Sequence, residues 1–286
     1  PIPSWLLDVL LAINISVALT ILFATMFSKE VLDMSFFPTM LLFTTIFRIA
    51  LNTSSTRLIL RDGNAGNVVE TFGEFVGGGD LVIGVIIFII LILIQFMVIN
   101  KGSERVSEVT ARFTLDAMPG KQMAIDSDLN TGAITDKEAA ERRKKLQQEN
   151  SFFGSMDGAT KYVKGDATAG LIITAINLVG GIAMGMLYNG MSINDALSTY
   201  SILTIGDGLC SQIPSLLISL STGILVTKAS SEGELGDEMV GQLFSMDRVL
   251  IMVGAALILL GVGTPLPFYI FVPCLLYTSP SPRDCS

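Results

Sequence analysis

The chain has 286 residues, of which half are apolar and only 15% are charged, and its mean hydropathy is +0.62. Soluble domains usually carry about 25% charged residues, so this composition predicts an all-α, polytopic helical membrane protein. The absence of histidine excludes histidine-based catalysis and histidine-ligated metal sites, and a net charge of −8 argues against nucleic-acid binding. The three cysteines form no CxxC pair, and we expect neither a metal site nor a cofactor.

Long apolar stretches follow one another along the chain. A membrane-spanning helix needs about 20 mostly apolar residues to cross the hydrocarbon core. About seven spans are predicted, the last of them only begun, and they lie within residues 9–28, 36–60, 81–99, 167–194, 200–227, 249–263 and a stretch that starts at Leu266.

A polar segment divides these spans into two groups. Residues 101–164 contain 11 of the 18 Lys and Arg residues, and cytoplasmic loops are enriched in these cations. The segment is therefore predicted to be cytoplasmic. The expected organisation is three spans in residues 1–99, a cytoplasmic helical loop in 100–165, and three spans with the start of a fourth in 166–273.

The cytoplasmic loop carries its own helix signal. Thr135 and Glu138 have the spacing of a capping box, which predicts that a charged helix begins directly after Thr135. Glu138 and Arg142 are spaced for an i,i+4 ion pair along that helix. The cationic run 142–145 is interpreted as a solvated helix face, with attraction to anionic lipid headgroups as the alternative.

Two arginines fall inside the second predicted span, where an ionisable side chain costs roughly 2.5–3.5 kcal/mol at mid-bilayer. Arg57 lies nine residues after Arg48, and at about 100° per residue the two side chains point to opposite faces of a helix. One neighbouring helix cannot partner both. Either protein surrounds this span, or Arg57 extends to the extracytoplasmic surface.

Four further ionisable residues lie at or just inside the ends of predicted spans, namely Asp8, Lys161, Asp166 and Asp207. Asp8 and Asp166 have a structural alternative as helix starts, where the helix dipole favours a carboxylate. Lys161 lies five residues before Asp166 and could pair with it. A Gly-Asp-Gly sequence around Asp207, followed by Pro214, predicts a broken or kinked helix. Carboxylates and a lysine at such positions are the groups that a proton path requires.

Several longer segments have a distinctive sequence. They are FRIALNTSSTRLIL (47–60), KGSER (101–105), ARFTLDAMPGKQMAIDSDLN (111–130), GSMDGATKYVKGD (154–166) and TIGDG (204–208) with QIP (212–214). Together they resemble the FHIPEP family, the export-gate proteins of type III secretion, over about residues 1–273. Thr53 departs from the family pattern, which more often has an apolar residue there.

The resemblance implies an eight-span domain in the bacterial inner membrane, followed by a large cytoplasmic domain. Compared with that plan, this chain is expected to lack the first span, most of the last span and the cytoplasmic domain. The family implies a homo-oligomeric, nonameric ring that works with other export-apparatus membrane proteins. It couples ion-motive force to the export of unfolded flagellar subunits, with chaperones and subunits docking on the cytoplasmic domain.

The resemblance also assigns functional residues. The family's membrane charges for the proton or ion pathway fall on Asp8, Arg57, Lys161, Asp166 and Asp207. Arg48 is a further intramembrane charge. The motif loop of the family contributes Arg112, Asp116, Pro119, Gly120 and Lys121.

Three alternatives to a flagellar export gate remain open at this point. The first is the homologue of virulence-type injectisomes, although the segment NAGNVV (64–69) leans towards the flagellar system. The second is a secondary transporter or ion channel that works alone. The third is an intramembrane aspartyl protease, but Thr204 occupies the first glycine position of the required Gly-x-Gly-Asp motif, so we do not expect an enzyme.

The tail differs in character from the rest of the chain. Its sequence CLLYTSPSPRDCS (274–286) does not resemble the family. We interpret it as a non-native segment derived from a translated sequencing adapter, with a genuine Pro/Ser-rich tail as the alternative.

Overall fold

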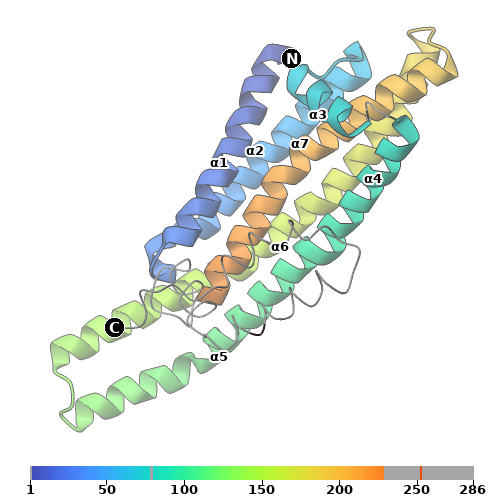
Figure 1. Ribbon diagram of the computed structural model, residues 1–286. Coiled ribbons are helices and arrows are strands. Elements are labelled where there is room, and N and C mark those ends of the chain that lie inside the picture. The colour runs from blue at the N-terminus through green and yellow to red at the C-terminus, as the bar shows by residue number, and fades with distance from the viewer. Residues whose placement is uncertain (1, 78–79, 229–251, 253–286) are drawn as a thin grey trace, which may run out of the picture. The chain divides into compact units, whose positions relative to one another are not determined.

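The computed structural model describes residues 2–77, 80–228 and 252, and within this part the chain is helical with no β-strand. The helical segments there are α1 (Ser4–Phe27), η1 (Val31–Met34), α2 (Phe37–Asp62), α3 (Asn67–Gly77), α4 (Leu81–Ile94), η2 (Gln95–Asn100), α5 (Lys101–Asn130), α6 (Asp136–Leu187) and α7 (Ile193–Thr227). The long helices pack side by side as a bundle, with the short α3 at one end (Figure 1). The predicted all-α class is confirmed.

Five helical stretches in the described part are long and apolar enough to cross a membrane. They are Ser4–Phe27, Val31–Asp62, Leu81–Asn130, Asp136–Leu187 and Ile193–Thr227. Each overlaps one of the first five predicted spans, although the fourth, predicted within 167–194, ends in the structure at Leu187. The predicted sixth span, the start of a seventh and the tail 274–286 lie outside the described residues.

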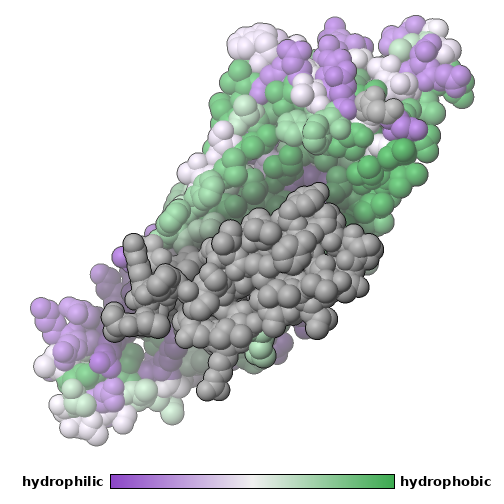
Figure 2. All heavy atoms as spheres, viewed as in Figure 1, coloured by the Kyte–Doolittle hydropathy of each residue, from purple (hydrophilic) through white to green (hydrophobic). Residues whose placement is uncertain are grey.

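The hydropathy of the surface agrees with a membrane-embedded bundle. In the view of Figure 2, hydrophobic residues cover the middle of the described helices, and hydrophilic residues gather at their two ends. The apolar α4 illustrates this, because side chains in its middle such as Ile89 and Ile90 are 50% and 49% exposed. An exposed apolar face of this length fits lipid and not water.

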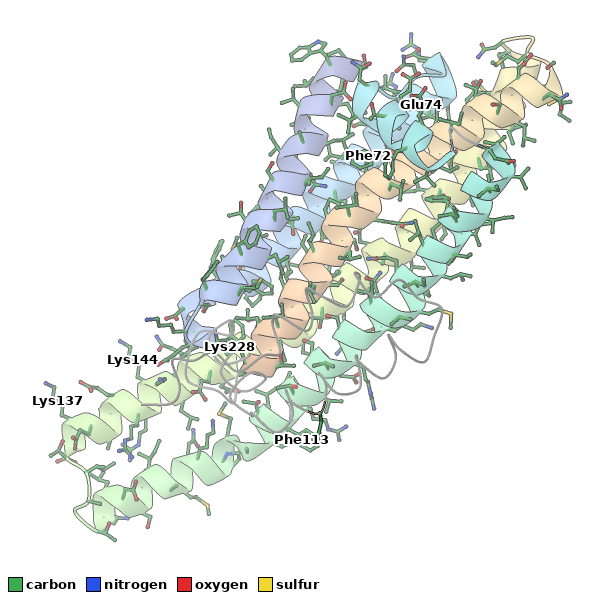
Figure 3. The ribbon with its side chains drawn as sticks, viewed as in Figure 1. Phe72, Glu74, Phe113, Lys137, Lys144 and Lys228 are labelled. Atoms are coloured by element: carbon green, nitrogen blue, oxygen red, sulfur yellow. The ribbon has the colours of Figure 1, made fainter. Side chains whose placement is uncertain are left out.

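The end of α5 and the beginning of α6 form a polar hairpin that extends beyond the other helices (Figure 1). The predicted capping box is confirmed: the Thr135 hydroxyl accepts from the Glu138 N–H at 3.3 Å, and the Glu138 carboxylate accepts from the Thr135 N–H at 2.8 Å. These bonds from Thr135 lower the pKa of the Glu138 carboxyl. Figure 3 shows Lys137 and Lys144 on the α6 arm of this hairpin.

The cationic run 142–145 is more than a solvated face. Arg142 and Arg143 donate to Asp128 at 3.2 Å and Asp126 at 2.5 Å, both on the α5 arm. Lys145 reaches Glu30, beside η1, at 2.8 Å. The direct ion pair of Arg142 is thus with Asp128 across the hairpin, while its charge also lowers the pKa of the Glu138 carboxyl. The pairs are exposed, and each contributes at most about 1 kcal/mol.

Helix α7 lies inside the bundle and is the most buried of the five spans in the described part, with 56% of its apolar window buried against 17–33% for the other four. Of the broken or kinked helix predicted at Asp207, the break is wrong, since α7 runs without interruption through Gly206, Gly208 and Pro214. Neighbouring helices enclose this segment. In a low-dielectric bundle an opened helix would leave backbone groups without partners, so close packing favours the continuous helix.

Small residues allow α6 and α7 to approach closely. A Cβ added at Gly181 would lie 2.3 Å from Cδ1 of Tyr200, and one at Gly185 would lie 2.6 Å from Cε2 of the same ring. Tyr200 is fully buried. These two glycines, four residues apart on α6, therefore leave room for the Tyr200 ring between the two helices.

A candidate ion-coupling site within the helix bundle

The centre of the site is a buried ion pair between α2 and α6. Nε of Arg48 lies 2.6 Å from Oδ2 of Asp166, and Nη2 donates to the same oxygen. Arg48 is 2% exposed and Asp166 is 7% exposed. Within the described part of the chain, Nη1 of Arg48 is buried without a hydrogen-bond partner. A charged group at this depth needs a partner of opposite charge, and each residue supplies it for the other.

The structure corrects two expectations about this pair. Asp166 does not cap a helix start, because it lies well inside the continuous helix α6. Lys161 does not pair with it: Lys161 is exposed, and its Nζ lies 2.7 Å from Oδ2 of Asp157. Five residues on an α-helix place two side chains about 140° apart, so Lys161 and Asp166 face different neighbours.

Helix α2 carries a buried polar stripe towards α6 and α7. Arg48, Asn52 and Ser55 follow the i, i+4, i+7 spacing of one helix face, and they are 2%, 5% and 1% exposed. Asn52 accepts a hydrogen bond from Ser211 of α7. In the sequence, this stripe is marked by polar residues at helical spacing inside a predicted span. Charged residues alone do not reveal it.

Arg57 lies on the opposite side of α2 and is exposed, as the helical phase predicted. It lines a separate hollow near the end of the helix with Thr53, Ser54 and Arg61. The structure therefore does not bring Arg57 to the Arg48–Asp166 pair.

Asp207 forms a second buried acidic position, between α7 and α6. It is 5% exposed, and one of its carboxylate oxygens accepts from Nδ2 of Asn177 at 2.8 Å. Asn177 is fully buried, and in the described chain its own Oδ1 has no hydrogen-bond partner. Ser55 of the α2 stripe also interacts with this carboxylate. An asparagine in the middle of an uncharged predicted span was the available signal for this partner.

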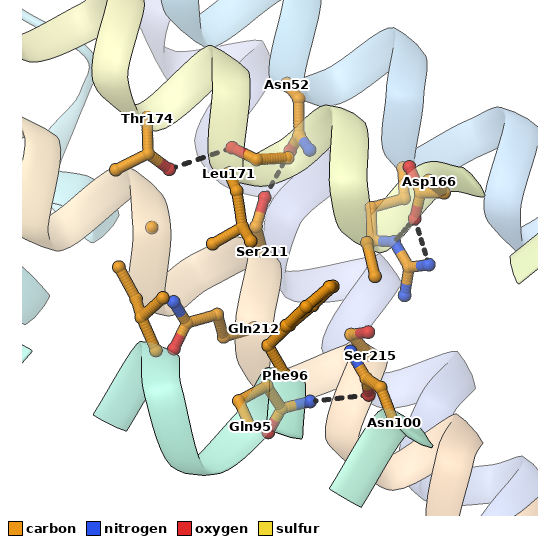
Figure 4. Close-up of a pocket in the computed structure, with 15 residues that line it drawn as sticks. Asn52, Gln95, Phe96, Asn100, Asp166, Leu171, Thr174, Ser211, Gln212 and Ser215 are labelled. Atoms are coloured by element: carbon orange, nitrogen blue, oxygen red, sulfur yellow. Dashed lines mark hydrogen bonds and ion pairs between the residues drawn. The ribbon is translucent and has the colours of Figure 1, made fainter. Parts of the chain in front are cut away.

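A cavity lies beside the Arg48–Asp166 pair (Figure 4), and Asp207 is not among its lining residues. About 50 Å³ of it is open to the centres of water molecules. Its lining consists of Arg48, Asn52, Ile92, Gln95, Phe96, Asn100, Asp166, Ala167, Gly170, Leu171, Thr174, Gly208, Ser211, Gln212 and Ser215. A polar cavity needs only about 10–15 Å³ of this kind of space to hold one water, so this one has room for several.

Asp8 makes a capping contact with the start of another helix. Its carboxylate accepts from the backbone N–H groups of Asn67 at 3.1 Å and Val68 at 3.0 Å. These are the first residues of α3, a helix between the second and third predicted spans. Gly66 has φ +95°, and a Cβ there would lie 2.4 Å from the Asp8 carboxylate. Asp8 therefore caps a helix start, but that of α3 and not of its own helix.

Replacing Asp8 by alanine is expected to destabilise the protein by about 1 kcal/mol, because two N–H donors at the start of α3 lose their acceptor. Hydrogen exchange at residues 67–70 should accelerate, while exchange in α5 stays unchanged. Asp62→Ala, on an exposed side chain at the end of α2, is the matched control. Equal exchange in both variants would show that the cap does not hold α3.

The residues of the family's motif loop lie on α5, away from the buried site. Arg112 and Asp116 are exposed, with Nε of the arginine 3.9 Å from Oδ2 of the aspartate. Nζ of Lys121 lies 3.0 Å from Oε2 of Glu149 on α6. Pro119 is accommodated inside α5, and a Cβ added at Gly120 would meet open space. Across the described residues, no group of three or more His, Cys, Asp or Glu side chains is arranged to hold a metal ion.

Comparison with known proteins supplies the context of this site. The FHIPEP family model matches residues 1–279. The flagellar biosynthesis protein FlhA of Bacillus subtilis is 58% identical over 266 residues, which cover 93% of this chain and 39% of that protein. FlhA of Salmonella typhimurium is 51% identical over 98% of this chain and 41% of that protein. The protein MxiA of Shigella flexneri is 49% identical over 95% of this chain and 40% of that protein.

The chain thus spans about two fifths of the length of these curated relatives. No solved structure matches it. A family model that covers nearly the whole chain, together with relatives at about half identity or better, settles the classification. The chain belongs to the FHIPEP family.

Proposed function

We propose that these residues form the membrane part of a flagellar type III export gate, which couples ion-motive force to the export of unfolded flagellar subunits. The observation that carries the proposal is the buried Arg48–Asp166 pair beside a polar cavity, with Asp207 on the next helix. Ionisable groups are costly inside a membrane bundle, and those that are retained usually serve an ion pathway. The relatives named as flagellar biosynthesis proteins support the same assignment.

The geometry supports a mechanism based on protonation. A proton that binds at Oδ2 of Asp166 neutralises the carboxylate and removes the partner that both Nε and Nη2 of Arg48 contact. The bond between α2 and α6 then weakens. Moving one charge through the membrane potential is worth about 2.3 kcal/mol per 100 mV. That energy shifts a two-state equilibrium by more than tenfold, enough to alternate the bundle between two arrangements.

In the full-length protein, Asp166→Asn and Asp207→Asn are each expected to abolish export of flagellar subunits and leave membrane insertion intact. Asparagine keeps the size of the side chain but cannot exchange a proton. Secreted subunits in the culture medium and gate protein in the membrane fraction are the two readouts. Asp157→Asn, on the same helix but partly exposed, is the matched control. Normal export from both site variants would reject the mechanism.

The remaining expectations of the family extend the proposal. The protein would lie in the bacterial inner membrane as a homo-oligomeric, nonameric ring, in contact with other export-apparatus membrane proteins. Chaperones and exported subunits would dock on a cytoplasmic domain. The five apolar stretches of the described chain and the family match support a membrane location.

A second candidate is the corresponding gate of a virulence-type secretion system, which the 49% identity to MxiA favours. The two candidates separate in cells. Fusing residues 1–273 to the rest of a flagellar relative should restore motility to a strain that lacks that relative. Restored secretion in a strain that lacks MxiA, without restored motility, would favour the second candidate.

A further inference from the structure

A second, smaller cavity adjoins the cavity of Arg48 and Asp166. Its lining consists of Asn100, Ser103, Glu104, Thr160, Val163, Lys164, Ser219 and Thr222, and about 20 Å³ of it is open to water centres. Asn100 lines both cavities, so the two spaces share a wall. Apart from Val163, these lining residues are polar or charged. By volume and by polarity, the second cavity can hold a water molecule.

Polar contacts continue through the shared wall. Oδ1 of Asn100 accepts from Nε2 of Gln95 at 3.3 Å and from Oγ of Ser219 at 3.1 Å. Oγ of Ser103 donates to the carbonyl oxygen of Ser219 at 2.6 Å. Hydrogen-bonding groups of η2, α5 and α7 therefore follow one another from the Asp166 cavity into the second one.

The π-helix η2 explains how this wall is built. Gln95 and Asn100 are its first and last residues. In a regular α-helix, five residues turn the chain through about 500°, which leaves the two side chains about 140° apart. A π-turn closes i to i+5 and brings such residues to one side. Both amides consequently line the same cavity, and they bond to each other.

The second cavity ends at an ion pair. Nζ of Lys164 lies 2.8 Å from Oε1 of Glu104, and the two side chains are 56% and 22% exposed. This is the side that the Lys and Arg distribution assigns to the cytoplasm. Lys161, which the family resemblance placed on the pathway, lines neither cavity.

We propose that the cytoplasmic end of the proton route is the hydrated passage from Asp166 past Asn100 and Ser219 to Glu104 and Lys164. This proposal rests on the proposed function and adds the place where the proton leaves the protein on the cytoplasmic side. A proton released from Asp166 first moves along water in the first cavity. Water beside Asn100 and Ser219 then carries it into the second cavity, where it binds a carboxylate oxygen of Glu104. Lys164 holds that carboxylate in place. Because the Glu104 side chain is partly exposed, the proton can then leave it for bulk water.

Thiol labelling tests the hydration of this passage independently of export. In a full-length variant whose native cysteines, including Cys210, are alanine, Asn100→Cys and Ser219→Cys are labelled with a charged, water-soluble methanethiosulfonate. Only a hydrated thiolate reacts fast, so both should react at least about tenfold faster than Ala111→Cys. Ala111 is 2% exposed in an apolar cluster on the same helix as Glu104. Rates equal to that of Ala111→Cys would overturn the passage.

Export then tests the role of Glu104. Glu104→Gln should reduce secretion at least about tenfold, since general acid–base groups typically contribute 10²–10⁴-fold to proton transfer. Glu108→Gln, on an exposed side chain one turn further along α5, should not. The double variant Glu104→Gln/Lys164→Met removes the pair without leaving a lone charge. It should remain defective, whereas recovered export would mean that the pair only holds the helices together.

The two proposals fail in different ways. If Asp166→Asn blocks export but Glu104→Gln does not, this exit is wrong and the export-gate mechanism stands. If neither variant blocks export, the mechanism itself fails, and the exit fails with it.

Discussion

Arg48→Met is expected to destabilise the helix bundle by about 3–5 kcal/mol, the range for removing one partner of a buried ion pair. The substitution leaves the carboxylate of Asp166, which is 7% exposed, either charged without its partner or obliged to take up a proton. Both outcomes weaken the contact between α2 and α6. Equilibrium unfolding of the purified protein in detergent micelles, followed by helical circular dichroism, measures the loss.

The double variant Arg48→Met/Asp166→Leu should recover most of that stability. Replacing both members of a buried pair by apolar residues of similar volume is often neutral or stabilising, because no charge then needs desolvation. Here Nη1 of Arg48 already has no hydrogen-bond partner in the described chain, which makes the native pair an expensive arrangement.

Arg57→Met is the control for removing an arginine from the same helix. Its side chain is exposed on the opposite face, so the loss should stay below about 1 kcal/mol. If Arg48→Met cost no more than Arg57→Met, the ion pair would not be a major contact between α2 and α6.

Gly206→Ala is expected to destabilise the protein by more than the usual 1–3 kcal/mol of an overpacked core. The added Cβ would lie 1.8 Å from the carbonyl oxygen of Val69 and 2.8 Å from its carbonyl carbon. The contact is reciprocal, because a Cβ at Gly73 would lie 2.2 Å from the carbonyl oxygen of Ile202. Helices α3 and α7 therefore meet backbone to backbone, and no flexible side chain can yield.

The same substitution at Gly158 should act in the opposite direction. A Cβ there meets open space on α6, and alanine is favoured over glycine in a helix by up to about 1 kcal/mol. Denaturation midpoints of both variants in the same detergent give the comparison. Equal stability of Gly206→Ala and Gly158→Ala would show that α3 does not pack on α7 at this distance.

The parts of the fold that depend on short-range patterns could be predicted. The first five spans follow from the lengths of apolar stretches, and the start of α6 follows from the Thr135–Glu138 capping box. The opposite orientations of Arg48 and Arg57 follow from helical periodicity alone. None of these depends on knowing which helix packs against which.

The partners within the site could not be predicted in the same way. Asp166 pairs with Arg48, 118 residues earlier in the chain, whereas the sequence offered Lys161 as the nearest cation. Helical phase follows from the sequence of each span, yet the identity of its neighbour is set by tertiary packing. Tertiary packing also explains why α7 is uninterrupted. The helices that enclose it override the local tendency of Gly-Asp-Gly and proline to break it.

Helix α3 was not predicted because its 11 residues lie between predicted spans and include two glycines. Its start is stabilised from a distance by Asp8, which the sequence offered only as a charge near a span end. The family resemblance assigned Asp8 to the ion pathway, and the capping contact gives this residue a structural task in addition.

Export from the double variant Arg48→Met/Asp166→Leu tests most directly the claim that these buried charges are kept for coupling and not for stability. The variant should insert in the membrane and unfold at a denaturant concentration close to that of the native protein, yet secrete no flagellar subunits. Secretion at the native level from that stable, charge-free pair would contradict the account.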